Sequence, residues 1–147
     1  MTNLYTIGFT GKSAEKFFEL LKSSSAIRLI DVRLNNVSQL AGFSKKDDLQ
    51  YFLKEILNWE YIHMPKFAPT EKLLSDYKSK KIDWKDYENI YLEHLITTNA
   101  LKYLDKDKIL NSVLLCSEHD PKHCHRRLLA EFIKKHLKEI DIIHLMN

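Results

Sequence analysis

Hydrophobic and polar residues repeat along the chain with two periods, one typical of strands and one of helices. Short apolar runs predict strands at residues 4–7, 27–32, 59–63, 110–116 and 140–145, and Gly8 and Gly11 end the first of them. Between these runs, apolar residues recur three or four positions apart and predict amphipathic helices. We expect these helices to begin at Ser13, at Asp47 or Asp48, at Thr70, at Trp84 and at Cys124.

The alternation of strands with helices predicts parallel strand pairing, because a crossover helix returns the chain to the same edge of the sheet. Parallel sheets are covered on both faces. We therefore predict an α/β fold: a single three-layer domain over residues 1–147, with a mostly parallel sheet and helices on both faces. The length of 147 residues suits one domain with one core.

Composition narrows the class of protein. The chain has 44% hydrophobic and 29% charged residues, which is typical of a globular protein. Its net charge of +3 and sequence pI of about 8.7 permit an anionic ligand but do not indicate nucleic acid. Two cysteines are too few for a disulfide scaffold, and neither a leader pattern nor a membrane-spanning apolar stretch is visible. We expect a soluble, cytoplasmic protein with reduced thiols and no membrane partner.

The richest segment for chemistry is residues 116–126, CSEHDPKHCHR, which follows a predicted strand and leads into a predicted helix. Ligands of open α/β folds bind at this carboxyl edge of the sheet. Cys124, His125 and Arg126 are predicted in the first helical turn, where free N–H groups and the helix dipole favour anions and lower the pKa of a thiol. Arg126 adds a fork that suits a carboxylate or a phosphate.

The two thiols are expected to differ. Cys116 follows Val113, Leu114 and Leu115, so we expect it to be buried with a raised pKa and to react slowly. Cys124 stands near basic residues and is expected to be the more reactive thiol. The alternative is that Cys124 packs under the loop as a small, inert hydrophobic residue.

The strand at 27–32 ends at the same edge in Asp31-Val32-Arg33. We expect Asp31 and Cys116 to end adjacent or near-adjacent parallel strands, with Arg33 and Glu118 lining one cleft. Asp31 is either catalytic or a structural partner that holds Arg33 and nearby backbone. Backbone groups at Gly8 and Thr10 are candidates for close contact with a ligand, and Ser38 is a weaker candidate.

Four residues of this segment are of the types that bind zinc: Cys116, His119, Cys124 and His125. Their spacing matches no paired arrangement of cysteine or histidine ligands, and neighbouring residues such as Cys124 and His125 point in different directions on a helix. We therefore assign no metal and no cofactor.

These segments together resemble a domain of unknown function, family 488 (DUF488). The resemblance covers nearly the whole chain and is carried by Tyr5-Thr6-Ile7-Gly8, Leu29-Ile30-Asp31-Val32-Arg33 with Ser38 and Phe43 downstream, Tyr61-Ile62-His63-Met64-Pro65, Leu114-Leu115-Cys116-Ser117-Glu118, Cys124-His125-Arg126 and Ile143-His144-Leu145. The chain departs from the common pattern at Phe9-Thr10-Gly11, where many members have a His-Ser pair. It also has Lys66-Phe67-Ala68-Pro69-Thr70 in place of a Leu-Gly-Gly segment, as in a sub-branch with an Ala-Pro-Thr turn. The resemblance implies an α/β fold and a shared polar site, and no reaction.

The leading functional hypothesis is an enzyme that acts on a small anionic or nucleotide-like substrate. Arg33 and Arg126 are expected to bind the anion, Glu118 or His125 to act as acid or base, and Cys124 or Cys116 as nucleophile. The alternatives are a non-catalytic module that binds a nucleotide or nucleic acid, and a metal-stabilised structural domain. The sequence assigns no oligomeric state.

Overall fold

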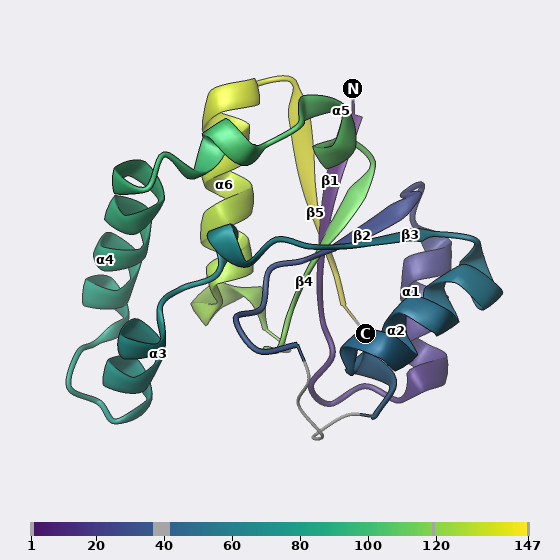
Figure 1. Cartoon of the computed structure of the whole chain (residues 1–147), viewed down its shortest axis with the longest axis horizontal. Helices are drawn as coiled ribbons and strands as arrows, with labels where there is room; N and C mark the ends of the chain where they lie inside the picture. Colours follow the sequence, from purple (N-terminus) through teal and green to yellow (C-terminus); the bar gives the residue numbers. More distant parts are fainter. Residues whose placement is uncertain (1, 37–41, 119, 147) are drawn as a thin grey trace.

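The computed structural model describes residues 2–36, 42–118 and 120–146. Its centre is a five-stranded sheet in the order β3-β2-β4-β1-β5, and every neighbouring pair of strands is parallel (Figure 1). The predicted α/β fold is therefore confirmed. The strands are β1 (Thr2–Gly8), β2 (Arg28–Asp31), β3 (Glu60–His63), β4 (Ser112–Cys116) and β5 (Ile140–Leu145).

Helices cover both faces of the sheet (Figure 1). Within the described residues, no helix has both the length and the apolar character needed to cross a membrane. The α-helices are α1 (Ala14–Ser23), α2 (Lys46–Phe52), α3 (Glu71–Lys78), α4 (Trp84–Thr97), α5 (Lys106–Ile109) and α6 (His125–Leu137). The shorter helical turns are Gly42–Ser44, Leu53–Leu57, Pro65–Phe67, Ala100–Tyr103 and Pro121–His123.

The sheet separates two apolar cores, because successive side chains of a strand point to opposite faces. On β4, Val113 and Leu115 pack with the side chains of α1 and α2, whereas Leu114 packs with those of α4 and α6. Cys116 has the same strand parity as Leu114, so it ends its strand on the α6 face. Asp31 pairs in register with Leu115 and so points toward α1 and α2.

The order of the strands creates a crevice at the carboxyl edge. β1 leads through α1 to β2, on the far side of β4, while β4 leads through α6 to β5, on the far side of β1. Connections that leave neighbouring strands in opposite directions open the edge of the sheet between them, where ligands bind in such folds. The ends of β1, β2 and β4 all lie at this opening.

Element ends differ from the predicted ones at two points that matter for the site. The strand expected over residues 27–32 is shorter, Arg28–Asp31, which leaves the Val32 carbonyl free of the ladder for a side-chain contact. The helix α6 begins at His125, and Cys124 is its N-cap in extended conformation rather than a residue of its first turn.

The position of α6 depends on its buried apolar side. Leu129 lies on this side and is fully buried in the core shared with α4. We expect Leu129→Ala to lower the free energy of unfolding by about 2–5 kcal/mol, since it removes buried contacts and leaves a cavity. Urea denaturation measures this change. The matched control is Ile96→Ala on α4, where the side chain is 67% exposed and the cost should stay below about 0.5 kcal/mol. Equal losses in the two variants would contradict this account of the core.

Candidate functional site

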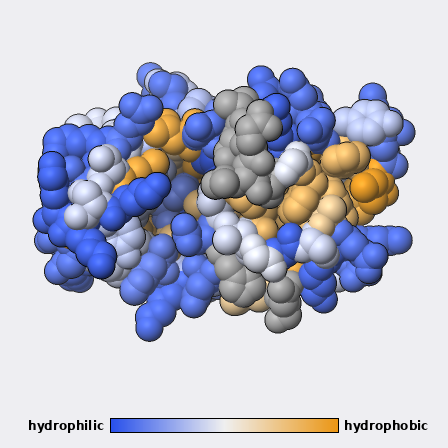
Figure 2. Space-filling model, turned by 90° about the horizontal axis from the view of Figure 1, so that it is seen from below, coloured by the Kyte–Doolittle hydropathy of each residue, from blue (hydrophilic) through white to orange (hydrophobic). Residues whose placement is uncertain are grey.

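A cavity of about 500 Å³ lies at the carboxyl edge of the sheet. Figure 2 looks onto this edge: hydrophilic side chains dominate over α3 and α4, and apolar surface gathers over α1 and α2. The cavity is lined by Arg33, Leu34, Asn35, Pro69, Glu71, Leu74, Tyr77, Tyr87, Cys116, Ser117, Glu118, His123, Cys124 and His125. Asp31 and Cys116 lie at the ends of adjacent parallel strands, and Arg33 and Glu118 line one cleft, so the predicted geometry is confirmed.

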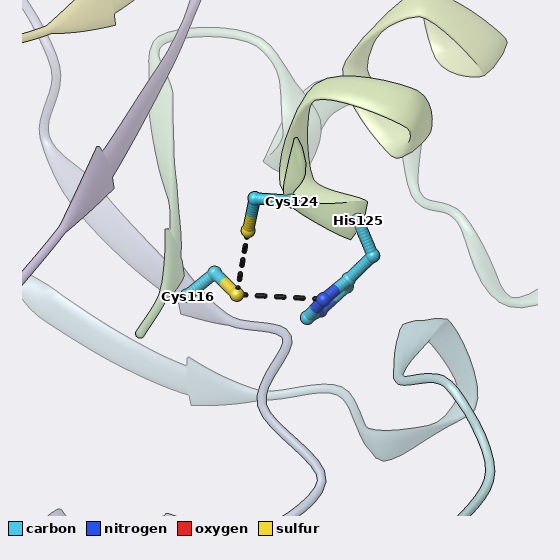
Figure 3. A group of neighbouring side chains, drawn as sticks. All are labelled: Cys116, Cys124 and His125. Carbon is cyan, nitrogen blue, oxygen red and sulfur yellow. Dashed lines mark hydrogen bonds between the residues drawn. The ribbon is translucent and has the colours of Figure 1, made fainter. Parts of the chain in front are cut away.

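The thiol of Cys116 contacts the side chains of both Cys124 and His125. Its Sγ accepts a hydrogen bond from Sγ of Cys124 at 2.9 Å and lies 3.4 Å from Nδ1 of His125 (Figure 3). Cys116 comes from the end of β4, while Cys124 and His125 come from the start of α6. The strand and the helix thus bring two thiols and one imidazole together.

The imidazole of His125 is oriented by a backbone carbonyl. Its Nε2 lies 2.8 Å from the Val32 oxygen, and a carbonyl oxygen only accepts hydrogen bonds. Nε2 therefore carries a proton, and Nδ1 is the nitrogen that exchanges a proton with Sγ of Cys116. A nucleophile beside a base that a third group holds in place is the arrangement of a catalytic thiol.

The backbone N–H groups of Ser117 and Glu118 also favour the charged form of the Cys116 thiol. The carbonyls of the same residues are held on the other side: Thr10 N–H donates to the Ser117 oxygen at 3.0 Å, and Arg126 Nη1 donates to the Glu118 oxygen. In a planar trans peptide, a carbonyl and the N–H that follows it point in opposite directions. Turning the Ser117 carbonyl toward Thr10 therefore turns the Glu118 N–H toward the thiol.

Gly8 leaves the room that the loop after β4 needs in this position. A Cβ atom at Gly8 would lie 1.6 Å from the Glu118 carbonyl oxygen and 2.8 Å from Nη1 of Arg126. Only a residue without a side chain leaves room for the carbonyl and the guanidinium that holds it. Gly8 and Thr10 thus support the loop from behind, and neither is among the residues that line the cavity.

The contacts give the two thiols opposite pKa directions. Burial raises the pKa of Cys116, but the hydrogen bond from Cys124, the charge of Arg126 and the two backbone N–H donors bring this pKa below its ordinary value. Burial, together with the hydrogen bond to Cys116 and its negative charge, raises the pKa of Cys124 well above its ordinary value.

This result corrects the predicted order of the two thiols. Burial alone would raise the pKa of Cys116. Four residues that lie beyond the end of β4 lower it instead: Ser117, Glu118, Cys124 and Arg126. The basic neighbours of Cys124 do not make it a thiolate, because its side chain is only 2% exposed and its proton is donated to Cys116. Cys116 is therefore the more acidic of the two thiols.

Arg33 is held at the cavity wall by a buried carboxylate. Its Nε and Nη2 donate to the two oxygens of Asp31 at 2.8 and 2.7 Å, and Nη2 also donates to the Ser44 carbonyl. Tyr61 donates its hydroxyl proton to Asp31 at 2.6 Å, and burial and the Asp31 charge raise the pKa of that phenol. Asp31 has this structural place and does not line the cavity.

Nη1 of Arg33 differs from the other two nitrogens of the guanidinium. The side chain is 3% exposed, and its buried Nη1 has no hydrogen-bond partner among the residues that the structure describes. An unpaired buried donor is costly. Because Arg33 lines the cavity, its guanidinium brings a positive charge to the wall and suits an anionic group of a bound molecule.

Arg126 has a different place from the one expected. Its side chain is fully buried, with Nε donating to Thr6 Oγ1 at 3.3 Å and Nη1 donating to the Glu118 carbonyl. It is not among the residues that line the cavity. Its charge therefore lies behind the loop and not at the cavity wall, where a residue that binds the anion was expected. Ser38, the weaker candidate, lies outside the described residues.

An aromatic wall completes the cavity on the α4 side. Tyr77, Tyr87 and His123 line it, and Trp84 stacks on Tyr87 at a centroid distance of 4.9 Å and on His123 at 4.8 Å. Tyr87 is both a buried residue of the core and a residue of the cavity wall. The spacing of apolar residues along a helix predicts that a side chain is buried, but it does not predict whether that side chain also lines a cavity.

The donor atoms of Cys116, Cys124 and His125 all lie within 4.8 Å of one another, as a metal site requires. Tetrahedral zinc with bonds near 2.3 Å to each thiolate would hold two sulfurs roughly 3.8 Å apart. The observed separation of the two sulfurs is 2.9 Å, shorter than this distance. His119, the fourth residue weighed for zinc, lies outside the described residues.

Comparison with known proteins gives one result. The family model described as "Domain of unknown function DUF488" matches residues 13–133, which include the ends of β2 and β4 and the start of α6. No curated protein and no solved structure matches the chain.

The contacts of Cys116 predict how the two thiols react. Iodoacetamide at neutral pH should modify Cys116 before Cys124, because only the thiolate is nucleophilic. Cys124→Ala removes a hydrogen-bond donor and should slow the labelling of Cys116 up to about tenfold, the effect of one unit of pKa on the thiolate fraction. Peptide mapping by mass spectrometry measures the rates. Cys124→Ser is the matched control, since its hydroxyl still donates. First modification at Cys124 in the unaltered protein would refute this assignment.

The contact at Gly8 predicts a second effect on the same thiol. Gly8→Ala forces the Glu118 carbonyl away, which should lower the free energy of unfolding by about 1–3 kcal/mol through overpacking. The displaced loop also withdraws the N–H donors, so Cys116 should be labelled more slowly at neutral pH. Urea denaturation and labelling kinetics measure the two effects. The control is Gly42→Ala, where an added Cβ meets nothing within 4 Å. An unchanged labelling rate in Gly8→Ala would contradict the proposed role of the loop.

Proposed function

The chain belongs to the family described as Domain of unknown function DUF488, and we propose that it is a cysteine-dependent enzyme. In this proposal Cys116 forms a transient covalent bond with a small substrate that carries an anionic group. The observation that carries the proposal is the set of groups around one sulfur at a cavity. The Cys124 thiol and the His125 imidazole contact Sγ of Cys116, and the Ser117 and Glu118 N–H groups favour its charged form.

The reaction class that suits these contacts is acyl transfer to and from the thiol. Sγ of Cys116 attacks an electrophilic carbonyl carbon, and the electron pair of the C=O bond moves to oxygen. As sulfur loses its negative charge, the N–H donors of Ser117 and Glu118 become available to the new oxyanion nearby. The leaving group then departs with a proton from Nδ1 of His125, which had accepted the proton of the thiol.

Water completes the cycle. Nδ1 of His125 removes a proton from a water molecule, whose oxygen attacks the thioester carbon, and the C–S bond breaks to regenerate Cys116. The Val32 carbonyl keeps the same nitrogen of the ring facing the sulfur throughout. One base thus serves both halves of the reaction, as in other enzymes with a paired thiol and imidazole.

The substrate is argued from the cavity walls. A volume of about 500 Å³ is typical of sites for small molecules. The guanidinium of Arg33 offers a positive charge for a carboxylate or phosphate, while Tyr77 and Tyr87 provide an apolar, aromatic surface. These features support a small anionic substrate with a flat or apolar part, which includes nucleotide-like molecules.

A binding module without catalysis accounts for less of what is observed. A site that only binds an anion has no need of a thiol with a lowered pKa beside an oriented imidazole. Perturbed pKa values in a cleft are typical of catalytic groups.

The test compares two activated esters that differ only in charge: a nitrophenyl monoester of a dicarboxylic acid, and the nitrophenyl ester of the matching monocarboxylic acid. We expect kcat/KM to favour the anionic ester about tenfold, as one hydrogen bond to a charged group provides. The double variant Asp31→Asn with Arg33→Gln should lose this preference without leaving an unpaired buried charge. Release of nitrophenol measures the rates.

Two further variants make this test specific. Cys116→Ser should abolish hydrolysis and the acyl adduct that mass spectrometry detects on the thiol. Arg127→Gln is the control for loss of an arginine, since Arg127 pairs with Glu88 and Glu131 outside the cavity and its change should preserve the preference. Hydrolysis that survives Cys116→Ser at the original rate would reject the proposal.

A further inference from the structure

We propose that Cys116 and Cys124 form a peroxide-responsive pair, in which a hydroperoxide oxidises Cys116 and Cys124 then closes a disulfide with it. The chain's two cysteines are eight positions apart in sequence, yet their Sγ atoms lie 2.9 Å from each other. Both are free thiols, and both line the cavity. The inference adds regulation to the nucleophile of the proposed enzyme, and it rests on that proposal only in assigning Cys116 as the reactive thiol.

The geometry needs little change to form the bond. A disulfide holds its sulfurs at about 2.05 Å, so the two atoms must approach by less than about 1 Å. Cys124 has extended backbone just before α6, and the turn Pro121–His123 precedes it, so the residue is outside regular secondary structure and its side chain can turn without breaking a ladder or a helix. Figure 3 shows Cys124 and Cys116 pointing toward one another from the helix start and the strand end.

The first step takes place at Cys116. Its Sγ, as thiolate, attacks the terminal oxygen of a hydroperoxide; an S–O bond forms and the O–O bond breaks. The leaving oxygen takes the proton that Nδ1 of His125 received from the Cys116 thiol. The products are a sulfenic acid on Cys116 and one molecule of alcohol, or of water from hydrogen peroxide.

Oxidation of Cys116 then prepares Cys124 for the second step. Burial, the hydrogen bond to Cys116 and the negative charge of Cys116 together keep the pKa of Cys124 high. A sulfenic acid is uncharged, so the effect of that charge ends when Cys116 is oxidised. Cys124 therefore releases its proton more readily after the first step than before it.

Closure of the disulfide balances the reaction. Sγ of Cys124 attacks Sγ of the sulfenic acid, the S–S bond forms, and hydroxide leaves and takes the Cys124 proton as water. In total, two thiols are oxidised and one hydroperoxide is reduced to an alcohol and water. Two molecules of a small thiol, acting in succession, reduce the disulfide and restore the site.

The disulfide has two consequences for the site. It removes the nucleophile of the acyl-transfer reaction, so the oxidised protein is inactive until it is reduced. It also protects Cys116 from further oxidation to sulfinic acid, which small thiols do not reverse. Cys124 thus both stabilises the thiolate in the reduced protein and rescues it after oxidation.

The test uses the fully reduced, chelator-treated protein and hydrogen peroxide. We expect intact-mass spectrometry to show the loss of two hydrogen atoms, and peptide mapping to show a link between Cys116 and Cys124. Dithiothreitol should reverse both changes. Cys116 should also react with peroxide roughly tenfold faster than free cysteine, because its thiolate fraction is larger at neutral pH.

Matched variants separate the two steps. Cys124→Ser should stop at an oxidised Cys116 that gains one oxygen atom and reacts with dimedone, while Cys116→Ser should leave Cys124 as a thiol under the same conditions. Oxidation of the unaltered protein to a sulfinic acid with no linked peptide would overturn the inference, and so would disulfides between chains alone.

The ester assay separates this inference from the proposed function. A protein that hydrolyses the anionic ester but forms no internal disulfide keeps the proposed function and overturns the inference. A protein that forms the reversible disulfide but transfers no acyl group to Cys116 supports the inference and overturns the proposed function.

Discussion

The buried charge of Arg126 is the constraint on which the rest of the site depends. A guanidinium removed from water must find hydrogen-bond acceptors, and here they include the Glu118 carbonyl and Thr6 Oγ1. The carbonyl contact draws the loop after β4 over Gly8, and that position directs backbone N–H groups to the Cys116 thiol. One packing requirement on α6 therefore sets the direction of backbone donors at the end of a neighbouring strand.

The same charge acts on other titratable groups around it. It contributes to the lowered pKa of Cys116, and it adds to burial in lowering the pKa of Lys12 and of His144. Thr6 shows how closely these groups are connected: its hydroxyl accepts from Nε of Arg126 and also forms a hydrogen bond with Nδ1 of His144. A cation in this position disfavours further positive charge and favours a thiolate.

The sequence was sufficient to predict the layers of the fold and the edge of the sheet at which the site lies. Both follow from periodicity and from the rule that parallel strands end at one edge. The structural role of Asp31 was one of the two alternatives predicted for it, whereas the burial of Arg126 could not be predicted with the same tools. Asp31 ends its strand with the parity of Leu29, which turns it away from Cys116, and this is fixed by register across β2 and β4. The burial of Arg126 depends on Gly8, a contact across more than a hundred residues.

The pKa order of the two thiols is the reverse of the one expected from local sequence, for a physical reason that bears on function. Local sequence suggests burial for Cys116 and positive charge for Cys124, yet a thiol's pKa is set by the atoms within hydrogen-bond reach of the sulfur. A buried thiol becomes acidic only when enough donors meet it, and one of those donors here is the second thiol. A second thiol close enough to donate is also close enough to form a disulfide after a small movement. In this site a single contact, between Cys124 and Cys116, therefore has two effects. It lowers the pKa of Cys116, and it is the contact through which Cys116 can be oxidised and recovered.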